Sequence, residues 1–481
     1  MEQSNHNSEL SILNSQFDEI RPYEAGEMKQ AFEELLNDRQ FSLVLKGFAP
    51  WLPKAVRNGL LRLAFLGVKT PLDFQLRFMK PVVKWIIRKH TDGCSFDDTS
   101  LRIENSELGI DNYDMSKCGN DAMKQGMQGN HNSQLSIPNS QLRYTFVSNH
   151  RDIVLDSAFL DVMLVDHGYP TTVEIGIGDN LLIYPWIKRL VRMNKAFTVR
   201  RGLTAHEMMR SSQLMSSYIH YAVTKKKENI WIAQREGRAK DSDDRTQESV
   251  LKMLAMGGPL LIENSELRME NYDMSQGGNA SGESLDGNIT DKGNHNSEFS
   301  ILNSQLLSSL KELNIVPLTI SYEFDPCDYL KAQEFQQKRD NPSFKKSKQD
   351  DLDNMKTGIF GYKGRVHYHC AAPANTWLNE LTDLPKAEFF KAVSQRMDRE
   401  LHRNYRLYPC NYIACDELNG NEEHAAHYTT ADKQRFEKYL NGQLAKINIP
   451  NKDEAFLRER MLTMYANPLR NKVKSEELLS L

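Results

Sequence analysis

One histidine and two aspartates lie within the segment Ser148 to Asp156 (SNHRDIVLD), and together they have the chemistry of a general base and its partner. A histidine whose ring is oriented by a carboxylate can take a proton from an alcohol as that alcohol attacks an acyl carbon. We therefore predict that His150 is a catalytic base and that Asp156 or Asp152 orients it. The alternative is a structural pair, with an aspartate capping the helix that begins here.

A second segment has the composition of a phosphate site. Asn194 to Gly202 (NKAFTVRRG) sets the apolar Phe197 close to the adjacent arginines Arg200 and Arg201. Guanidinium groups suit a phosphate because their paired N–H donors match its oxygens. Taken alone, this segment is equally well explained as a strand with a charged end.

A third segment, Ile230 to Arg238 (IWIAQREGR), runs from an apolar strand into Glu236, Gly237 and Arg238. Glycine at such a position lets a ligand approach the backbone closely. The alternative is a tight turn that has no ligand.

With a fourth segment, Ile315 to Glu323 (IVPLTISYE), these segments occur in an order that resembles the acyltransferases that esterify glycerol phosphates. That family contains the glycerol-3-phosphate, dihydroxyacetone-phosphate and lysophosphatidate acyltransferases. Its first block is a histidine, four residues and an aspartate, whereas five residues separate His150 from Asp156 here. The family pattern favours Asp156 as the partner of the base, and the extra residue leaves Asp152 as the alternative.

The resemblance extends over about residues 146 to 329 and implies roles for the other three blocks. It implies phosphate binding by the arginines of the second and third blocks, and substrate contacts by their neighbours and by the proline of the fourth. The residues that match are Phe197, Arg200 and Arg201 in the second block, Glu236, Gly237 and Arg238 in the third, and Val316, Pro317, Tyr322 and Glu323 in the fourth.

The family resemblance also implies a reaction. It is the direct transfer of a fatty acyl group from acyl-CoA or acyl carrier protein to a hydroxyl of glycerol-3-phosphate or a lysophospholipid, in phospholipid biosynthesis, with no cofactor. One alternative is an O-acyltransferase that acts on a lyso-aminolipid, because the same chemistry serves other positioned acceptors. Another is a catalytically inactive lipid- or membrane-binding protein, which the altered histidine-to-aspartate spacing would fit.

A metal site has less support in the sequence. His367 and His369 alternate within an apparent strand, Arg365 to Cys370, which is a possible spacing for metal ligands. No third or fourth ligand accompanies them, so we predict that no metal is bound.

The surrounding pattern predicts an α/β fold. Apolar strands alternate with helices from Arg143 to Ala372, which indicates a layered domain with a mixed sheet flanked by helices. The family resemblance implies that this domain is of the acyltransferase type. Pro317 is expected at the beginning of its strand or on an edge, because proline lacks a backbone N–H. Residues 18–102 and 373–481 are predicted to form helical N- and C-terminal regions.

Repeated sequence interrupts this pattern. Asn5 to Phe17 (NHNSELSILNSQF) returns with few changes at Asn130 to Leu142 and again at Asn294 to Leu306, and a second unit at Ile103 recurs at Ile262. These stretches are rich in Asn, Ser and Gly, and too far apart to stack as a solenoid. We predict a disordered tail at residues 1–17 and two disordered insertions at residues 103–142 and 262–306.

The N-terminal helical region combines basic with aromatic residues. Between Phe41 and Lys89 it contains ten Lys or Arg residues and one acid. This composition favours peripheral contact with an anionic membrane, although a solvated basic face over an ordinary core is the alternative. With 61 Lys and Arg against 64 Asp and Glu, the whole chain gives no reason to expect nucleic acid. Scattered cysteines and a polar N-terminus predict a cytoplasmic protein, peripheral on the cytoplasmic face of the membrane.

Overall fold

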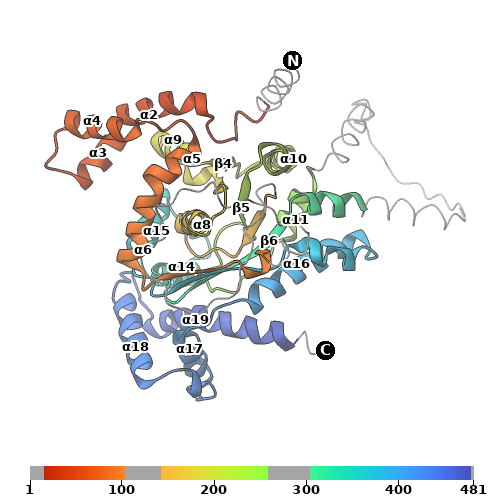
Figure 1. Ribbon diagram of the computed structural model, residues 1–481. Helices are drawn as coiled ribbons and strands as arrows, with labels where there is room; N and C mark the ends of the chain where they lie inside the picture. Colours follow the sequence, from red (N-terminus) through yellow and green to blue (C-terminus); the bar gives the residue numbers. More distant parts are fainter. Residues whose placement is uncertain (1–15, 103–141, 258–303, 478–481) are drawn as a thin grey trace, which may run out of the picture.

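The centre of the protein is a seven-stranded mixed sheet, seen in a computed structural model that describes residues 16–102, 142–257 and 304–477 (Figure 1). The strand order is β1-β7-β6-β2-β5-β3-β4. Five neighbouring strands are parallel: β2 (Thr145–Ser148), β3 (Val173–Gly178), β4 (Ala196–Val199), β5 (Asn229–Ala233) and β6 (Ile315–Tyr322). β7 (Val366–Cys370) is antiparallel to β6, and β1 (Cys94–Asp97) is parallel to β7.

Helices cover both faces of the sheet. On one face, α6 (Lys80–His90) and α8 (Leu155–Asp166) share a hydrophobic core with the strands. On the other face, the core is completed by α10 (Ala205–Tyr221), α11 (Glu248–Ala255) and α16 (Lys386–Arg403). Parallel strands covered in this way are apolar on both sides, and every residue of β6 is buried. The predicted α/β fold with a mixed sheet flanked by helices is confirmed.

Two groups of helices lie at opposite ends of this body (Figure 1). At the N-terminal end, a separate hydrophobic core joins the first helices of the chain to α9 (Pro185–Met193). The first helices are α2 (Met28–Asn37), α3 (Arg39–Phe48), α4 (Lys54–Phe65), α5 (Pro71–Phe74) and the π-helix η2 (Gln75–Met79). At the other end lie α17 (Pro409–Asn419), α18 (Thr430–Leu444) and α19 (Glu454–Glu477), which pack against α14 (Asp328–Asp340). α15 (Lys348–Phe360) follows α14. The short helices are η1 (Ala25–Glu27), η4 (Asp179–Leu181), η5 (Ala222–Lys226), η6 (Ala374–Thr376), η7 (Leu378–Leu381) and η8 (Ala425–His427).

Pro317 is the third residue of β6, which is an interior strand. Its carbonyl accepts a hydrogen bond from the amide of Ala371, just beyond the end of β7. In an antiparallel pair, the N–H and C=O of one residue point toward the same neighbouring strand. The N–H that Pro317 lacks would therefore point toward Ala371, just beyond the end of β7. Pairing with β7 begins at Leu318, and the proline therefore breaks no bond of that ladder.

The expected domain boundaries need two corrections. The N-terminal region is helical but also supplies β1, which the sequence did not predict. The boundary at residue 372 does not separate two cores, because Phe389 and Met397 of α16 lie in the same core as Ile230 of β5.

The last residue of each repeat copy contributes to the folded core. Phe17 is 2 % exposed, Leu306 is 7 % exposed, and Leu142 packs against the core that contains α8. The predicted tail and insertions therefore end one or more residues too late. The remaining residues of the tail and insertions, 1–15, 103–141 and 262–303, lie outside the described part of the chain, as do residues 258–261.

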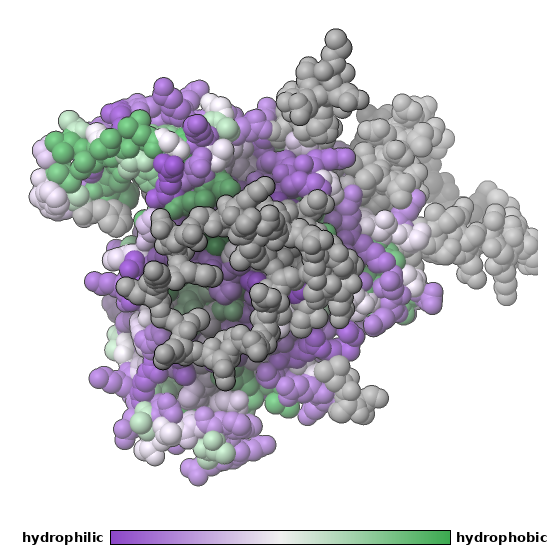
Figure 2. All heavy atoms as spheres, viewed as in Figure 1, coloured by the Kyte–Doolittle hydropathy of each residue, from purple (hydrophilic) through white to green (hydrophobic). Residues whose placement is uncertain are grey.

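The N-terminal helices carry an apolar surface that is open to solvent. On α4, Val56, Leu60 and Leu63 are exposed, and their spacing puts them on one side of the helix. Figure 2 shows hydrophobic residues gathered on this lobe. We call the following side chains the apolar helix surface: Leu43, Trp51, Val56, Leu60, Leu63, Leu66, Val82 and Trp85. Within the described residues, no helix is long and apolar enough to span a membrane.

Candidate functional site

The four segments singled out in the sequence end at one edge of the sheet or just beyond it. β2, β5, β3 and β4 are parallel neighbours, so their carboxyl ends lie side by side. The residues that follow them include His150, Glu236 and Arg201. In α/β proteins, ligands bind outside the carboxyl ends of such strands, and this edge is therefore the candidate site.

His150 contacts Asp156 at this edge. The Nδ1 atom of His150 is 2.9 Å from Oδ2 of Asp156, whose side chain is 1 % exposed. The same Oδ2 accepts hydrogen bonds from the backbone amides of Arg151 (2.7 Å) and Asp152 (3.0 Å), and Oδ1 accepts one from the hydroxyl of Tyr322 (3.2 Å). Three donors besides the histidine therefore fix the carboxylate, and it orients the ring.

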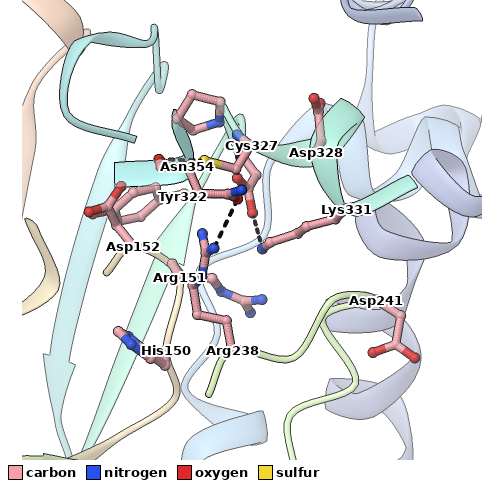
Figure 3. Close-up of polar contacts among 12 residues, drawn as sticks. His150, Arg151, Asp152, Arg238, Asp241, Tyr322, Cys327, Asp328, Lys331 and Asn354 are labelled. Carbon is pink, nitrogen blue, oxygen red and sulfur yellow. Dashed lines mark hydrogen bonds and ion pairs between the residues drawn. The ribbon is translucent and has the colours of Figure 1, made fainter. Parts of the chain in front are cut away.

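Asp152 has a different environment. Its Oδ1 accepts hydrogen bonds from the amides of Val154 (2.9 Å) and Leu155 (2.8 Å), so it caps the turn that leads into α8. Burial and the nearby charge of Asp156 raise the pKa of the Asp152 carboxyl. Its side chain points away from His150 in Figure 3. Of the two candidate partners, the structure brings Asp156 to the histidine.

A cavity of about 570 Å³ opens beside His150. Part of its wall is apolar and part is strongly cationic, with six basic side chains and two carboxylates. The apolar lining consists of Ile153, Ile175, Ile177, Leu181, Trp231 and Ala233, and the charged lining consists of Arg201, Arg235, Glu236, Arg238, Lys240, Lys331, Lys346 and Asp351. Such a cavity suits a ligand that has an apolar chain and an anionic group.

Three arginines of this wall have buried nitrogens without partners among the described residues. These are Nε of Arg201, Nε of Arg235 and one terminal nitrogen of Arg238. The other terminal nitrogen of Arg238 donates to Asn354 at 3.0 Å (Figure 3). A Cβ atom at Gly178 would come within 3.1 Å of Nε of Arg201, so glycine leaves room for this guanidinium. Unpaired buried donors are costly unless a ligand accepts from them.

The structure separates the two adjacent arginines. Arg201 lines the cavity and forms an ion pair with Glu236, whereas Arg200 forms an ion pair with Glu19, on the N-terminal segment that packs beside β4. Both arginines follow the end of β4, and only the side chain of Arg201 forms part of the cavity wall. The assignment of Arg200 as a phosphate-binding residue is corrected accordingly.

Two other expected substrate contacts are packing residues. Phe197 is fully buried and contacts the ring of Tyr218 at a centroid distance of 5.5 Å, in the core below α10. Pro317 is buried in β6, level with Val147 of β2, and does not line the cavity. Both residues shape the sheet that supports the site. Gly237 does line the cavity, and its φ of 69° is the left-handed conformation that glycine adopts without strain.

Sequence reasoning missed several side chains of the cavity. Trp231 lies edge-on to His150 with ring centroids 5.6 Å apart, and its Nε1 donates to the hydroxyl of Ser148 at 3.1 Å. Arg235 directly precedes Glu236 in the third segment, Ile230 to Arg238, so its basic character was a visible signal in the sequence. Lys346 gave no such signal in the sequence, because it lies more than a hundred residues further along the chain.

The two histidines of β7 have protein partners. Nδ1 of His367 lies 2.8 Å from the Ser95 hydroxyl, and Nδ1 of His369 lies 3.2 Å from Oδ2 of Asp97. Burial lowers the pKa of His367 to about 4. Within the described residues, no group of three or more His, Cys, Asp or Glu side chains could hold a metal ion.

None of the protein-family models and none of the curated proteins matches this sequence. The geometry of the cavity therefore carries the functional inference.

Proposed function

We propose that this protein transfers a fatty acyl group from a thioester donor, acyl-CoA or acyl carrier protein, to a hydroxyl of glycerol-3-phosphate or a lysophospholipid. One observation carries the proposal: the His150–Asp156 pair and three arginines with unpartnered nitrogens open onto the same cavity. A base that faces an anion site fits an acceptor that has both a hydroxyl and a phosphate. The layering of the sheet and its helices is, on this proposal, that of an acyltransferase domain.

The chemistry follows from the orientation of the histidine. When Nδ1 carries the ring proton and its N–H donates a hydrogen bond to Asp156, Nε2 is the basic nitrogen. Nε2 takes the proton of the acceptor hydroxyl as the oxygen forms a bond to the thioester carbonyl carbon. The C–S bond then breaks, and the imidazolium returns the proton to the departing thiolate. Nothing is oxidised or reduced, and the enzyme ends the cycle in its starting state.

The two parts of the cavity wall support the two parts of the substrate. The apolar side chains around Trp231 suit an acyl chain, and Arg201, Arg235 and Arg238 suit a phosphate. The experiment that tests the proposal incubates the purified chain with one labelled acyl-CoA and a panel of acceptors: glycerol-3-phosphate, dihydroxyacetone phosphate, lysophosphatidate and lyso-aminolipids. Transfer to a phosphate-bearing acceptor supports the proposal. Transfer confined to lyso-aminolipids, or no transfer to any acceptor, contradicts it.

The adjacent arginines provide a matched pair of variants. Arg201→Ala is expected to raise KM for the phosphate-bearing acceptor by about 10- to 100-fold, because a charge-assisted hydrogen bond contributes about 1.5–3 kcal/mol. Arg200→Ala is expected to leave KM nearly unchanged, because its partner is Glu19 on the surface. Steady-state kinetics with varied acceptor measure both. Equal KM values for the two variants would remove the phosphate site from the proposal.

We also propose that the protein is peripheral on the cytoplasmic face of a membrane, with the apolar helix surface as its contact. Eight large apolar side chains on this surface are exposed, Trp51 by 78 % and Leu66 by 68 %. A solvated basic face would not expose them. Exposed cations lie on the same helices and loops and complement anionic headgroups; they are Lys46, Lys54, Lys69, Arg88 and Lys89.

Polar substitutions on α4 test this contact. The double variant Leu60→Ser, Leu63→Ser is expected to weaken binding to vesicles that contain phosphatidylglycerol by at least about tenfold, because each buried leucine contributes about 1.5–3 kcal/mol. Val473→Ser on α19 is the control, since this exposed side chain lies at the other end of the molecule (Figure 1). Sedimentation with vesicles measures the binding. An equal loss in both variants, or no loss in either, would contradict the assignment of this surface.

A further inference from the structure

Three lysines of the region around the cavity share one buried carboxylate. Glu334, on α14, is 3 % exposed and forms ion pairs with Lys338 (2.9 Å), Lys346 (2.7 Å) and Lys240. Lys240 comes from the loop after β5, and Lys346 comes from the loop before α15. Lys338 lies one turn from Glu334 on α14, so the loop after β5, α14 itself and the loop before α15 bring their cations to a single point.

This lysine cluster (Lys240, Lys338 and Lys346 around Glu334) is strongly positive. Burial alone would raise the pKa of Glu334, but the three lysines outweigh this effect and hold its pKa at about 2. The glutamate is thus ionised and cancels one of the three charges, which leaves an excess of about two when all the lysines are protonated. Lys240 and Lys346 both line the cavity that contains His150. Repulsion between ammonium groups held this close is relieved when an anion binds.

We propose that Lys240 and Lys346 bind the phosphates of the nucleotide part of a CoA thioester, at a subsite separate from the arginines that hold the acceptor. The inference rests on the proposed acyl transfer and selects its donor. Two anionic ligands must enter one cavity in this reaction, and the cavity has two groups of cations. Arg201, Arg235 and Arg238 follow β4 and β5. The lysines, including Lys240 from the loop that carries Arg238, are held together by Glu334 of α14.

The recessed position of the lysines favours CoA over acyl carrier protein. The side chains of Lys240 and Lys346 are 30 % and 24 % exposed, and they form part of a concave wall. A carrier protein presents acidic side chains on a convex surface and would need cations on the outer face. Phosphates of a small flexible ligand can reach the lysines inside the cavity.

Binding of free CoA to the purified full-length protein tests the subsite without requiring turnover. Lys346→Gln is expected to weaken CoA binding by roughly tenfold or more, because charge-assisted hydrogen bonds to phosphate are lost. Lys345→Gln is the matched control, since the neighbouring lysine is exposed and does not line the cavity. Isothermal titration calorimetry gives both dissociation constants. Phosphopantetheine, which lacks the nucleotide, is expected to bind weakly and equally to the two variants.

A second measurement uses Lys240 and covers the case in which the glutamine variant is unstable. Burial lowers the pKa of Lys240 to about 8, with Glu334 and Lys338 as its charged neighbours. Its charge is therefore present below this pH and is lost as the pH rises through it. CoA affinity is expected to fall between about pH 7 and 9 in the unchanged protein. Lys240→Arg, which stays charged, is expected to show no such fall.

Several outcomes would overturn this inference. They are equal CoA affinities of Lys346→Gln and Lys345→Gln, a Lys240→Arg variant whose affinity still falls above pH 8, and a Lys346→Gln variant that loses glycerol-3-phosphate binding but retains CoA binding. Turnover with acyl carrier protein and no binding of CoA would also overturn it. CoA binding that depends on Lys346, without acyl transfer to any acceptor, would instead contradict the proposed reaction and leave the subsite standing.

Discussion

His150→Ala is expected to lower kcat by about 10²- to 10⁴-fold, the range that a positioned general base contributes. Alanine has no group that can take the proton of the acceptor hydroxyl. The carboxylate of Asp156 keeps its hydrogen bonds from Arg151, Asp152 and Tyr322, so the turn around the site stays in place. A radiometric assay with labelled acyl-CoA measures the loss.

The same variant is expected to stay folded. The His150 side chain is 14 % exposed and faces the cavity, so its removal leaves no closed void in the core. We expect the free energy of unfolding to fall by no more than about 1 kcal/mol, measured by urea denaturation. His206→Ala is the control, because this exposed histidine lies on α10 outside the cavity. Substantial residual transfer by a folded His150→Ala protein would end the assignment of this residue as the base.

Asp156→Asn is expected to lower kcat by about 10²- to 10⁴-fold, whereas Asp152→Asn is expected to change it by only a few fold. Asparagine at position 156 can still accept from the amides of Arg151 and Asp152, but it has no charge to stabilise the imidazolium. Asparagine at position 152 retains the oxygen that caps the turn before α8, and it is among the best capping residues.

Comparing the loss of kcat in the two aspartate variants identifies the partner of His150, whichever variant loses more. Both substitutions remove one buried carboxylate from the same turn and change side-chain volume little, so a general effect of lost charge would appear in both. Steady-state kinetics should be accompanied by thermal unfolding of each variant. A larger loss of kcat in Asp152→Asn than in Asp156→Asn would reassign the partner of His150.

Local patterns account for the parts of the fold that were predicted well. β5 and β6 lie at the apolar strands of the third and fourth segments, and α16 lies in the region 373–481 that was expected to be helical. Their hydrophobic periodicity is strong and is bounded by turn residues. β1 was missed because it has four residues, none of them fully buried, and it gains its place by pairing with β7 far along the chain. α19 continues through Pro468 to Glu477, although proline is unfavourable inside a helix.

Repeated sequence illustrates a different limit. The three copies are alike, and their composition favours disorder, yet Phe17 and Leu306 are buried in the core. Composition is averaged over a segment, whereas burial is decided by the one side chain that meets an apolar neighbour. The boundary of a folded domain therefore could not be placed to the residue from the repeat alone.

The sequence by itself determined the α/β architecture and the candidate base, because a strand followed by a histidine and an aspartate is a local pattern. Only the tertiary structure decided that Asp156 rather than Asp152 contacts His150, since the choice depends on where α8 begins. It also decided that Arg201 faces the cavity while Arg200 pairs with Glu19. Spacing along the chain sets which residues are close in sequence, but the direction of a side chain is set by contacts with distant segments.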